Sequence, residues 1–295
     1  MKNLYYYIKK AQKEKFAIGQ FNFSDFSQVK GMVQAAQNLK SPIILGTSEG
    51  ESKFVGLQEA VAIRDVLRKK TGLPIFLNLD HGKSFEYIKE AVLAGYDMVH
   101  FDGSKLPLEE NIKISKKVVA FSKKRGVLVE GEVGRFSEEA SKLYQETFEI
   151  KEEDLTSAQE ATDYINKTKV DLLAINIGTF HGIDANIISP HIKLSRLREI
   201  TLRLRSGQKE KISIPLVLHG GSGTPEEDVR EAIQRGITKI NINTETRLAF
   251  SNALRKTLEV NKDQIVPYKY LPEVINAVQI TVEKDIKLFG SSNKV

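Results

Sequence analysis

Short apolar runs alternate with amphipathic segments along the whole chain. The amphipathic segments, such as "SFEYIKEAVLAG" and "EEDVREAIQRG", end on the glycine expected just beyond a helix C-terminus. The apolar runs are mostly apolar on both faces, as buried parallel strands are. They cover residues 16–23, 42–48, 73–81, 97–104, 126–134, 170–178, 214–223 and 237–244. Strand and helix alternating eight times predict an α/β protein with a (β/α)8 TIM barrel.

The pattern also predicts what surrounds the barrel. An N-terminal helix at about residues 2–14 and a C-terminal helix at about residues 271–289 extend it. A doubly wound sheet is the competing architecture, but eight repeats without a break favour a single closed domain over residues 1–295. Two connections are long, at residues 135–169 and 179–213, and both follow strand C-termini. Because TIM barrels place their active sites at that end, we expect both loops to border the functional site.

Composition and charge narrow the class of protein. Of 295 residues, 41% are hydrophobic and 28% charged, which is typical of a globular protein with a sizeable core. The absence of cysteine excludes disulfides, thiolate metal sites and cysteine nucleophiles, so we expect a cytoplasmic location. No signal peptide or membrane span is evident, and we expect no membrane partner. The net charge of +6 is spread over mixed-sign segments without a basic, aromatic-rich block, so no nucleic-acid partner is expected.

The placement of the histidines indicates a metal site. Three of the five, His81, His181 and His219, are each followed by glycine at the ends of the third, sixth and seventh predicted strands. In a closed barrel these positions converge on one mouth, where three imidazoles suit a divalent cation such as Zn²⁺. A single His-Gly pair is better explained by a turn, but three such pairs favour the metal. His100 lies within a strand and is expected to be packed or hydrogen-bonded, whereas His191 lies in a loop and is expected to be solvated.

Carboxylates follow the same strand ends. Asp80 precedes the first of these histidines, and Asp102 ends the fourth predicted strand. Glu130 and Glu132 lie on one face of the fifth predicted strand, because side chains alternate with a period of two. Asp102 and Glu132 are candidates for a second cation position. The alternative for the two glutamates is a salt-bridged layer inside the barrel, and we expect it to hold for one of them.

A glycine-rich turn predicts a phosphate site. In "PLVLHGGSGTPEE", Gly220, Gly221 and Ser222 separate the strand from a helix that should start with Thr224 as N-cap. Backbone N–H groups in such a loop, next to a helix N-terminus, suit an anion. The eighth predicted strand ends in "NINT", residues 241–244. The loops after the seventh and eighth strands form the usual phosphate site of TIM barrels.

Seven motifs, in one order, resemble a known family. They are "SPIILGTSEG", "LDHG", "FDGS", "VEGEVG", "IGTFHG", "LVLHGGSG" and "KININTE". Nearly end to end, the chain resembles the class II, metal-dependent fructose-bisphosphate aldolases and their tagatose-bisphosphate relatives. By that resemblance the zinc ligands are His81, His181 and His219, a second divalent or monovalent cation is held by Asp102 and Glu132, and the catalytic carboxylate is Asp80. The dihydroxyacetone phosphate site is matched by Gly182, Gly220, Gly221, Ser222, Asn241, Asn243 and Thr244.

The resemblance implies a reaction. Fructose 1,6-bisphosphate would be cleaved reversibly to dihydroxyacetone phosphate and glyceraldehyde 3-phosphate, with Zn²⁺ stabilising an enediolate. Asp80 would exchange the proton of the C4 hydroxyl, and Asn241 would hydrogen-bond the enediolate. The asparagine in "NINT" fits the fructose branch of the family better than the tagatose branch. A phosphorylated sugar is the expected partner, and a homodimer or homotetramer is the expected assembly.

Three departures from the family concern the rest of the substrate. The loop after the fifth strand reads "GRFSEEASK", where Glu138 or Glu139 would have to handle the α-proton. "HGIDAN" lacks a lysine that the family often has, and "VPYKYL" places Tyr268 where the family often has a distal-phosphate arginine. Tagatose 1,6-bisphosphate and ketose 1-phosphates therefore stay open as substrates, as does a non-catalytic aldolase-like subunit. A Schiff-base aldolase is a further alternative, and Lys239 is the only candidate for its Schiff-base lysine, although it precedes the end of its strand.

Overall fold

Eight parallel strands close into a barrel. The computed structural model describes residues 2–134, 143–144, 151–179, 183–184, 191–206 and 214–295. The barrel strands are β1 (Ile18–Asn22), β2 (Ile43–Ser48), β3 (Ile75–Gly82), β4 (Met98–Phe101), β5 (Leu128–Val133), β7 (Leu172–Ile175), β9 (Leu216–Leu218) and β10 (Ile237–Ile242). Their order around the barrel is β1-β10-β9-β7-β5-β4-β3-β2, and every neighbouring pair is parallel. The predicted (β/α)8 barrel is thus confirmed.

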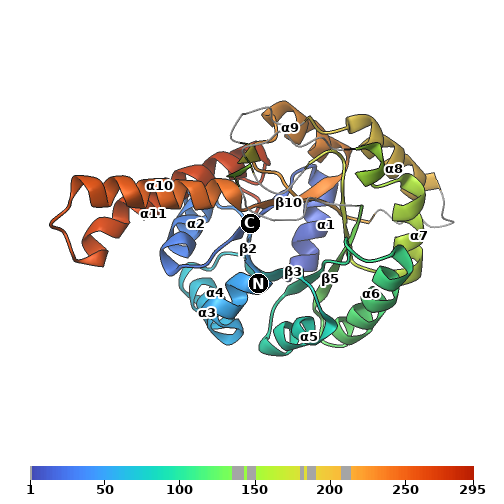
Figure 1. Cartoon of the computed structure of the whole chain (residues 1–295), viewed down its shortest axis with the longest axis horizontal. Helices are drawn as coiled ribbons and strands as arrows, with labels where there is room; N and C mark the ends of the chain where they lie inside the picture. Colours follow the sequence, from blue (N-terminus) through green and yellow to red (C-terminus); the bar gives the residue numbers. More distant parts are fainter. Residues whose placement is uncertain (1, 135–142, 145–150, 180–182, 185–190, 207–213) are drawn as a thin grey trace.

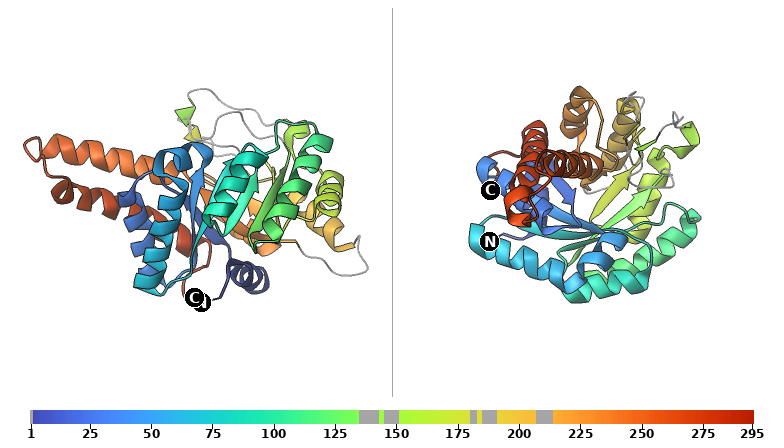
Figure 2. Two further views of the ribbon diagram at one scale, coloured as in Figure 1. Left: turned by 90° about the horizontal axis from the view of Figure 1, so that it is seen from below. Right: turned by 60° about the vertical axis from the view of Figure 1, so that its left-hand side comes forward.

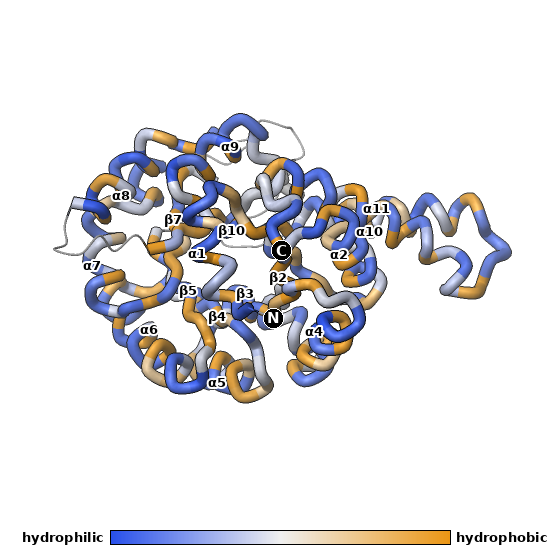
Figure 3. The backbone as a smooth tube through the Cα atoms, turned by 180° about the vertical axis from the view of Figure 1, so that it is seen from behind, coloured by the Kyte–Doolittle hydropathy of each residue, from blue (hydrophilic) through white to orange (hydrophobic). Residues whose placement is uncertain are grey.

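Helices form a ring outside the strands (Figure 1). The ring helices are α2 (Phe26–Leu39), α3 (Glu49–Val55), α4 (Leu57–Thr71), α5 (Phe85–Ala94), α6 (Leu108–Lys123), α7 (Ala158–Thr168), α8 (Leu194–Ser206) and α9 (Glu226–Arg235). A short 3₁₀ turn, Glu152–Asp154, precedes α7. In Figure 3 most helices alternate between hydrophobic and hydrophilic stretches, as amphipathic helices on a barrel should.

Side-chain alternation sorts each strand into an outer and an inner face. On β3, Leu77 and Leu79 pack in the hydrophobic core that lies between strands and helices, whereas Phe76 belongs to a second cluster inside the barrel. On β10, Ile240 and Ile242 likewise face the helices. The remaining inward positions nearer the carboxyl ends are polar and buried: Gln20, Asn22, Asn78, Asp80, His100, Glu130, Glu132, Lys239 and Asn241. This polar layer occupies the part of the barrel where the predicted site lies.

The N-terminal helix α1 (Leu4–Glu14) closes one end of the barrel. Its Leu4, Tyr7 and Ile8 pack against inward side chains such as Phe76, whose ring centroid is 5.7 Å from that of Tyr7. Figure 2 (left) shows α1 at one end and a small two-stranded sheet at the other. That sheet pairs β6 (Leu143–Tyr144) with β8 (Ile183–Asp184), one from each long connection. Among the described residues, α1 therefore covers the end of the barrel opposite to the long connections.

The chain ends in two long helices that project from the barrel. α10 (Thr244–Val260) and α11 (Pro267–Leu288) pack side by side, and their far end stands clear of the barrel in Figures 1 and 2. The expected C-terminal helix begins at Pro267, a few residues earlier than predicted, because proline is favoured in the first turn. Tyr268 lies at this far end with 75% of its surface exposed. In the described ranges, no helix has the length and apolarity needed to cross a membrane.

Asp285 of α11 is a buried carboxyl group that forms no ion pair with the described residues. It is 3% exposed, and its Oδ2 accepts no hydrogen bond from any described residue. Burial raises the pKa of Asp285 well above its usual range, Glu245 and Glu226 raise it further, and Lys284 offsets them only in part. Because the folded chain holds this proton more tightly than the unfolded chain does, stability falls as the pH rises above the usual carboxyl range.

We therefore expect Asp285→Asn to raise the Tm by about 2–4 °C at about pH 8, which corresponds to roughly 1 kcal/mol in a protein of this size. The gain should shrink at about pH 4, where the wild-type carboxyl is protonated in the folded state and in part of the unfolded chains. Thermal unfolding at both pH values measures this. Asp263→Asn, at an exposed position, is the matched control and should leave the Tm unchanged. Identical Tm values for Asp285→Asn and wild type at both pH values would contradict the argument.

Candidate active site

The carboxyl end of β3 places a carboxylate and an imidazole on the same side. In a regular strand, consecutive side chains such as Asp80 and His81 point to opposite faces. His81 instead has a φ of +50°, in the left-handed region that non-glycine residues rarely adopt. The pairing of β3 with β4 shifts register at the same place, between Leu79 and Gly82. This irregularity costs on the order of 1–3 kcal/mol, and such strain is concentrated at functional sites.

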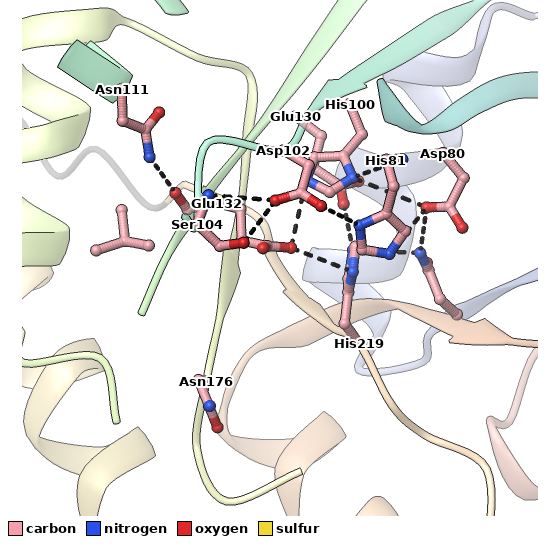
Figure 4. A network of polar contacts seen from close by, with 12 residues as sticks. Asp80, His81, His100, Asp102, Ser104, Asn111, Glu130, Glu132, Asn176 and His219 are labelled. Carbon is pink, nitrogen blue, oxygen red and sulfur yellow. Dashed lines mark hydrogen bonds and ion pairs between the residues drawn. The ribbon is translucent and has the colours of Figure 1, made fainter. Parts of the chain in front are cut away.

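Three imidazole rings meet inside the barrel (Figure 4). The ring centroids are 4.8 Å apart for His81 and His100, and 4.9 Å apart in each of the other two pairs, which involve His219. Donor atoms of these three residues and of Asp80 all lie within 4.8 Å of one another. The structure thus brings His81 and His219 together, as the sequence predicts.

Carboxylates orient two of the rings. His81 Nδ1 lies 3.0 Å from Asp102 Oδ2, and His219 Nε2 lies 2.6 Å from Glu130 Oε1. An ionised carboxylate only accepts hydrogen bonds, so the ring nitrogen that faces it carries the proton. His81 Nε2 and His219 Nδ1 are then the nitrogens suited to coordinate a cation. Carboxylate–imidazole pairs of this kind commonly orient metal ligands.

The same carboxylates make His81 more basic. Burial lowers the pKa of His81, but the charge of Asp80 and the hydrogen bond with Asp102 outweigh it and raise the pKa to about 9. A cation binds imidazole only at a deprotonated nitrogen, so binding at His81 releases a proton. Cation affinity should accordingly increase as the pH rises toward that value.

The prediction that His100 is a packed or hydrogen-bonded barrel residue is confirmed. Its side chain is fully buried, and its Nδ1 accepts a hydrogen bond of 3.1 Å from the backbone N–H of His81. The ring proton therefore sits on Nε2, which lies 3.4 Å from Glu132 Oε2. With Nδ1 engaged as an acceptor, His100 supports its neighbours rather than offering that nitrogen to a cation. Sequence reasoning did not place it against the other two rings, because no glycine follows it.

Two asparagine amides hold the carboxylate of Asp80. Asn22 Nδ2 donates to Oδ2 at 2.9 Å, and Asn241 Nδ2 donates to Oδ1 at 3.0 Å. Burial would favour the neutral acid, but the charge of His81 and the interactions with His100 hold the pKa of Asp80 well below its usual range. Asp80 is thus an ionised hydrogen-bond acceptor facing the imidazoles, as a general base must be.

Glu132 is a buried carboxylate without hydrogen bonds to the described residues. It is fully buried, and neither oxygen accepts a hydrogen bond from the residues that the structure places. Its Oε2 lies 3.4 Å from His219 Nδ1. Donor atoms of Glu132, Asp102 and His81 lie within 4.8 Å of one another. A buried carboxylate requires a cation or hydrogen-bond donors, so this group fits the predicted second cation position.

Glu130 belongs to a buried ion pair. Its Oε2 lies 2.8 Å from Lys239 Nζ, and both side chains are fully buried. Burial opposes ionisation, but the charge of Lys239 and the hydrogen bond with His219 hold the pKa of Glu130 below its usual range. One of the two strand glutamates thus forms a salt-bridged layer, as predicted. Because Lys239 is paired and enclosed, the geometry argues against the Schiff-base alternative.

The predicted phosphate loop adjoins the histidine cluster. Gly220, Gly221 and Ser222 follow His219 directly, and Gly220 has a φ of +63°. A Cβ atom at Gly221 would lie 2.7 Å from Ile240 Cγ2, so the loop packs closely on β10. Asn243 and Thr244 follow β10, where α10 begins without a side-chain cap hydrogen bond. Unpaired N–H groups of a helix first turn, next to a glycine loop, suit a phosphate.

The helix after the phosphate loop starts later than predicted. α9 begins at Glu226 with Pro225 as its N-cap residue, whereas the sequence indicates Thr224 as the cap. The hydroxyl of Thr224 donates instead to the carbonyl of Gly220, at 3.5 Å. Four predicted site residues, His181, Gly182, Glu138 and Glu139, lie outside the described residues, and their roles remain predictions.

Sequence reasoning missed a polar chain that links Asp80 to the barrel rim. Besides Asp80, Asn22 Nδ2 also donates to Glu51 Oε2, at 3.1 Å. The other oxygen of Glu51 accepts a hydrogen bond from Arg247 in the first turn of α10. One feature of the sequence could have indicated this polar chain. Asn22 lies two residues after Gln20, on the inward face of a strand that is otherwise apolar. Long-range partners of this kind cannot be read from local sequence.

Comparison with known proteins agrees with this geometry. The family described as "Fructose-bisphosphate aldolase class-II" matches residues 2–294. A 6-phospho-5-dehydro-2-deoxy-D-gluconate aldolase of Shouchella clausii is 38% identical over 96% of this chain and 92% of its own. A fructose-bisphosphate aldolase of Staphylococcus epidermidis is 34% identical over 96% of this chain and 95% of its own.

Among solved structures, the YdjI aldolase of Escherichia coli K12 aligns with a TM-score of 0.80 and 28% identity, covering 99% of this chain and 98% of its own. The family match spans nearly the whole chain, and the barrel carries a cluster of His81, His100, His219 and Asp80 whose donor atoms could hold a metal ion. The chain belongs to the class II fructose-bisphosphate aldolase family and is an aldolase.

Proposed function

We propose that this aldolase reversibly cleaves fructose 1,6-bisphosphate to dihydroxyacetone phosphate and glyceraldehyde 3-phosphate. The observation that carries the proposal is the ionised Asp80, held by two amides within 4.8 Å of imidazole donor atoms. A base beside a cation site is what retro-aldol cleavage of a ketose needs. The proposed cation is Zn²⁺ bound by His81, His181 and His219, with Asp102 and Glu132 available to a second cation.

The described residues fit a bound cation. The buried oxygens of Glu132 accept no hydrogen bond within the described ranges, and His81 and His219 each have a carboxylate partner. Imidazole nitrogens are preferred Zn²⁺ ligands, and a site with three protein ligands keeps a position open for substrate. When bound, the metal would supply Lewis-acid stabilisation of negative charge on the ketose oxygens.

The chain's own residues account for the remaining steps. Asp80 would take the proton of the C4 hydroxyl as the C3–C4 bond breaks, and return it in the condensation direction. Asn241, whose amide nitrogen lies 3.0 Å from Asp80, would donate to the oxygen that becomes negative on the three-carbon fragment. The loop around Gly221 and the start of α10 would hold the C1 phosphate and orient the reacting carbons.

A second candidate substrate is 6-phospho-5-dehydro-2-deoxy-D-gluconate. The relative with that name is 38% identical to this chain, compared with 34% for the fructose-bisphosphate aldolase of Staphylococcus epidermidis. Retro-aldol cleavage of 6-phospho-5-dehydro-2-deoxy-D-gluconate would also release dihydroxyacetone phosphate. The histidine cluster and the predicted phosphate loop would therefore suit both substrates. The two substrates differ in their other half, for which the family often uses an arginine at the position that Tyr268 holds in this chain.

An assay of released dihydroxyacetone phosphate tests all candidates with one readout. The substrates are fructose 1,6-bisphosphate, tagatose 1,6-bisphosphate, 6-phospho-5-dehydro-2-deoxy-D-gluconate and the ketose 1-phosphates. We expect the highest kcat/KM with fructose 1,6-bisphosphate, a loss of more than about 100-fold after chelation, and recovery with added Zn²⁺. A higher value with another substrate would reassign the specificity. Failure of the metal-loaded protein to cleave any of them would refute the proposed reaction and favour the non-catalytic alternative.

A further inference from the structure

A fully buried lysine lies beneath the candidate active site. Lys239 is on β10, two residues before Asn241, so both side chains point to the barrel interior. Its Nζ donates to Glu130 Oε2 at 2.8 Å and to Asn241 Oδ1 at 2.7 Å. Glu130 is on β5, which is three strands away from β10 around the barrel. No step of the proposed reaction uses this lysine, although burial of an ammonium group is costly.

The ammonium group dictates which way the amide of Asn241 faces. Lysine has only donors, so the group that meets it must be the amide oxygen. The amide nitrogen must then face the opposite way, where it lies 3.0 Å from Asp80 Oδ1 and donates to it. It also lies 3.2 Å from His219 Nε2, whose own proton is directed at Glu130, so the orientation rests on Lys239 and Asp80. A flipped amide would place nitrogen against the ammonium and oxygen against the Asp80 carboxylate. Both contacts would be repulsive, so one orientation remains.

Glu130 completes the arrangement. One of its oxygens binds Lys239, and the other lies 2.6 Å from His219 Nε2. The carboxylate therefore balances the lysine charge while it orients the imidazole. The ion pair has two consequences, charge balance and orientation of the Asn241 amide, and they can be tested separately. Charge balance is kept when Lys239 and Glu130 are both charged or both replaced by neutral residues. The orientation of Asn241 requires the lysine itself.

We propose that Lys239 is a positioning residue that fixes the Asn241 amide with its N–H groups toward Asp80 and the substrate. The proposal rests on the proposed function for its kinetic consequences, but the orientation itself is independent of the reaction. Lys239 would act through Asn241, without contacting substrate. Loss of the lysine should therefore impair the step in which negative charge develops, and substrate binding should change little.

Three variants test this in metal-loaded protein. Lys239→Met removes the ammonium at similar length, and Lys239→Met/Glu130→Gln also removes the unbalanced carboxylate. Asn241→Ala removes the amide itself. We expect both lysine variants and Asn241→Ala to lower kcat by about 100-fold, in the range for loss of one oxyanion donor, with KM changed less than about 3-fold. Lys167→Met, which removes a surface lysine that pairs with Glu109, is the matched control and should keep wild-type kinetics.

A double-mutant cycle separates positioning from charge balance. If Lys239 acts through Asn241, the triple variant Lys239→Met/Glu130→Gln/Asn241→Ala should have a kcat within about 3-fold of that of Asn241→Ala alone. Equal losses in the presence and absence of Asn241 would overturn the proposal. So would recovery of wild-type kcat in Lys239→Met/Glu130→Gln, since charge balance alone would then explain the lysine.

A measurement that needs no turnover separates this proposal from the proposed function. The side-chain amide signal of Asn241 in ¹⁵N-labelled protein is identified by its absence in Asn241→Ala. We expect this signal to shift and to lose protection from hydrogen exchange in Lys239→Met/Glu130→Gln, with Lys167→Met unchanged. An unmoved, equally protected signal would refute the positioning role even if the enzyme is an aldolase. A shifted signal in a protein without turnover would support the positioning role and refute only the proposed reaction.

Discussion

Replacement of Asp80 by alanine is expected to lower kcat by about 10²–10⁴-fold, the usual contribution of general acid–base catalysis. The carboxylate is 4% exposed and is held by hydrogen bonds of 2.9 Å from Asn22 and 3.0 Å from Asn241. Alanine removes the group that would accept the C4 hydroxyl proton. His81 and His219 keep their carboxylate partners in this variant, so bound metal should remain. Steady-state kinetics and elemental analysis of the same preparation measure both effects.

Glu109→Ala is the control for loss of a carboxylate. The Glu109 side chain is 79% exposed at the start of α6 and pairs only with Lys167 among the described ion pairs, so its variant should keep wild-type kcat. Near wild-type turnover in Asp80→Ala would remove Asp80 from the proposed mechanism. Loss of metal together with turnover would show instead that Asp80 holds the cation site together.

Replacement of His219 by alanine is expected to remove the bound metal. The His219 ring is fully buried between Glu130 and Glu132, at 2.6 Å and 3.4 Å respectively. Without it, one proposed ligand is lost and the carboxylates that surrounded it repel each other. We expect kcat to fall by more than about 100-fold, the upper end of the effect of losing an outer-sphere partner of a ligand. The metal content per chain should fall in parallel when measured after dialysis.

His191→Ala provides a matched histidine control. This side chain is 79% exposed and pairs with Asp228 at the surface, 2.9 Å away, as expected for a solvated histidine. Its variant should keep both metal and turnover. An unchanged metal content in His219→Ala would exclude His219 as a ligand, whatever happened to turnover.

The barrel could be predicted from the sequence because its cause is local. A buried parallel strand is mostly apolar on both faces, and each covering helix is amphipathic, so the alternation is visible without any long-range information. The predicted strand boundaries differ from those of the structure where polar residues of the site follow a strand. The seventh predicted strand covers residues 214–223, whereas β9 ends at Leu218 because the glycine loop that follows leaves the barrel wall.

The sequence by itself determined the residue types at the strand ends, including Asp80, His81 and His219, since barrel closure brings all strand ends to one mouth. Only the tertiary structure decided how these groups divide their roles. The positive φ of His81, the contact of His100 with both other rings and the Lys239–Glu130 pair all depend on residues far apart in the chain. Hydrogen bonding and charge pairing act over a few ångströms in space, and local sequence does not specify which distant side chain supplies the partner.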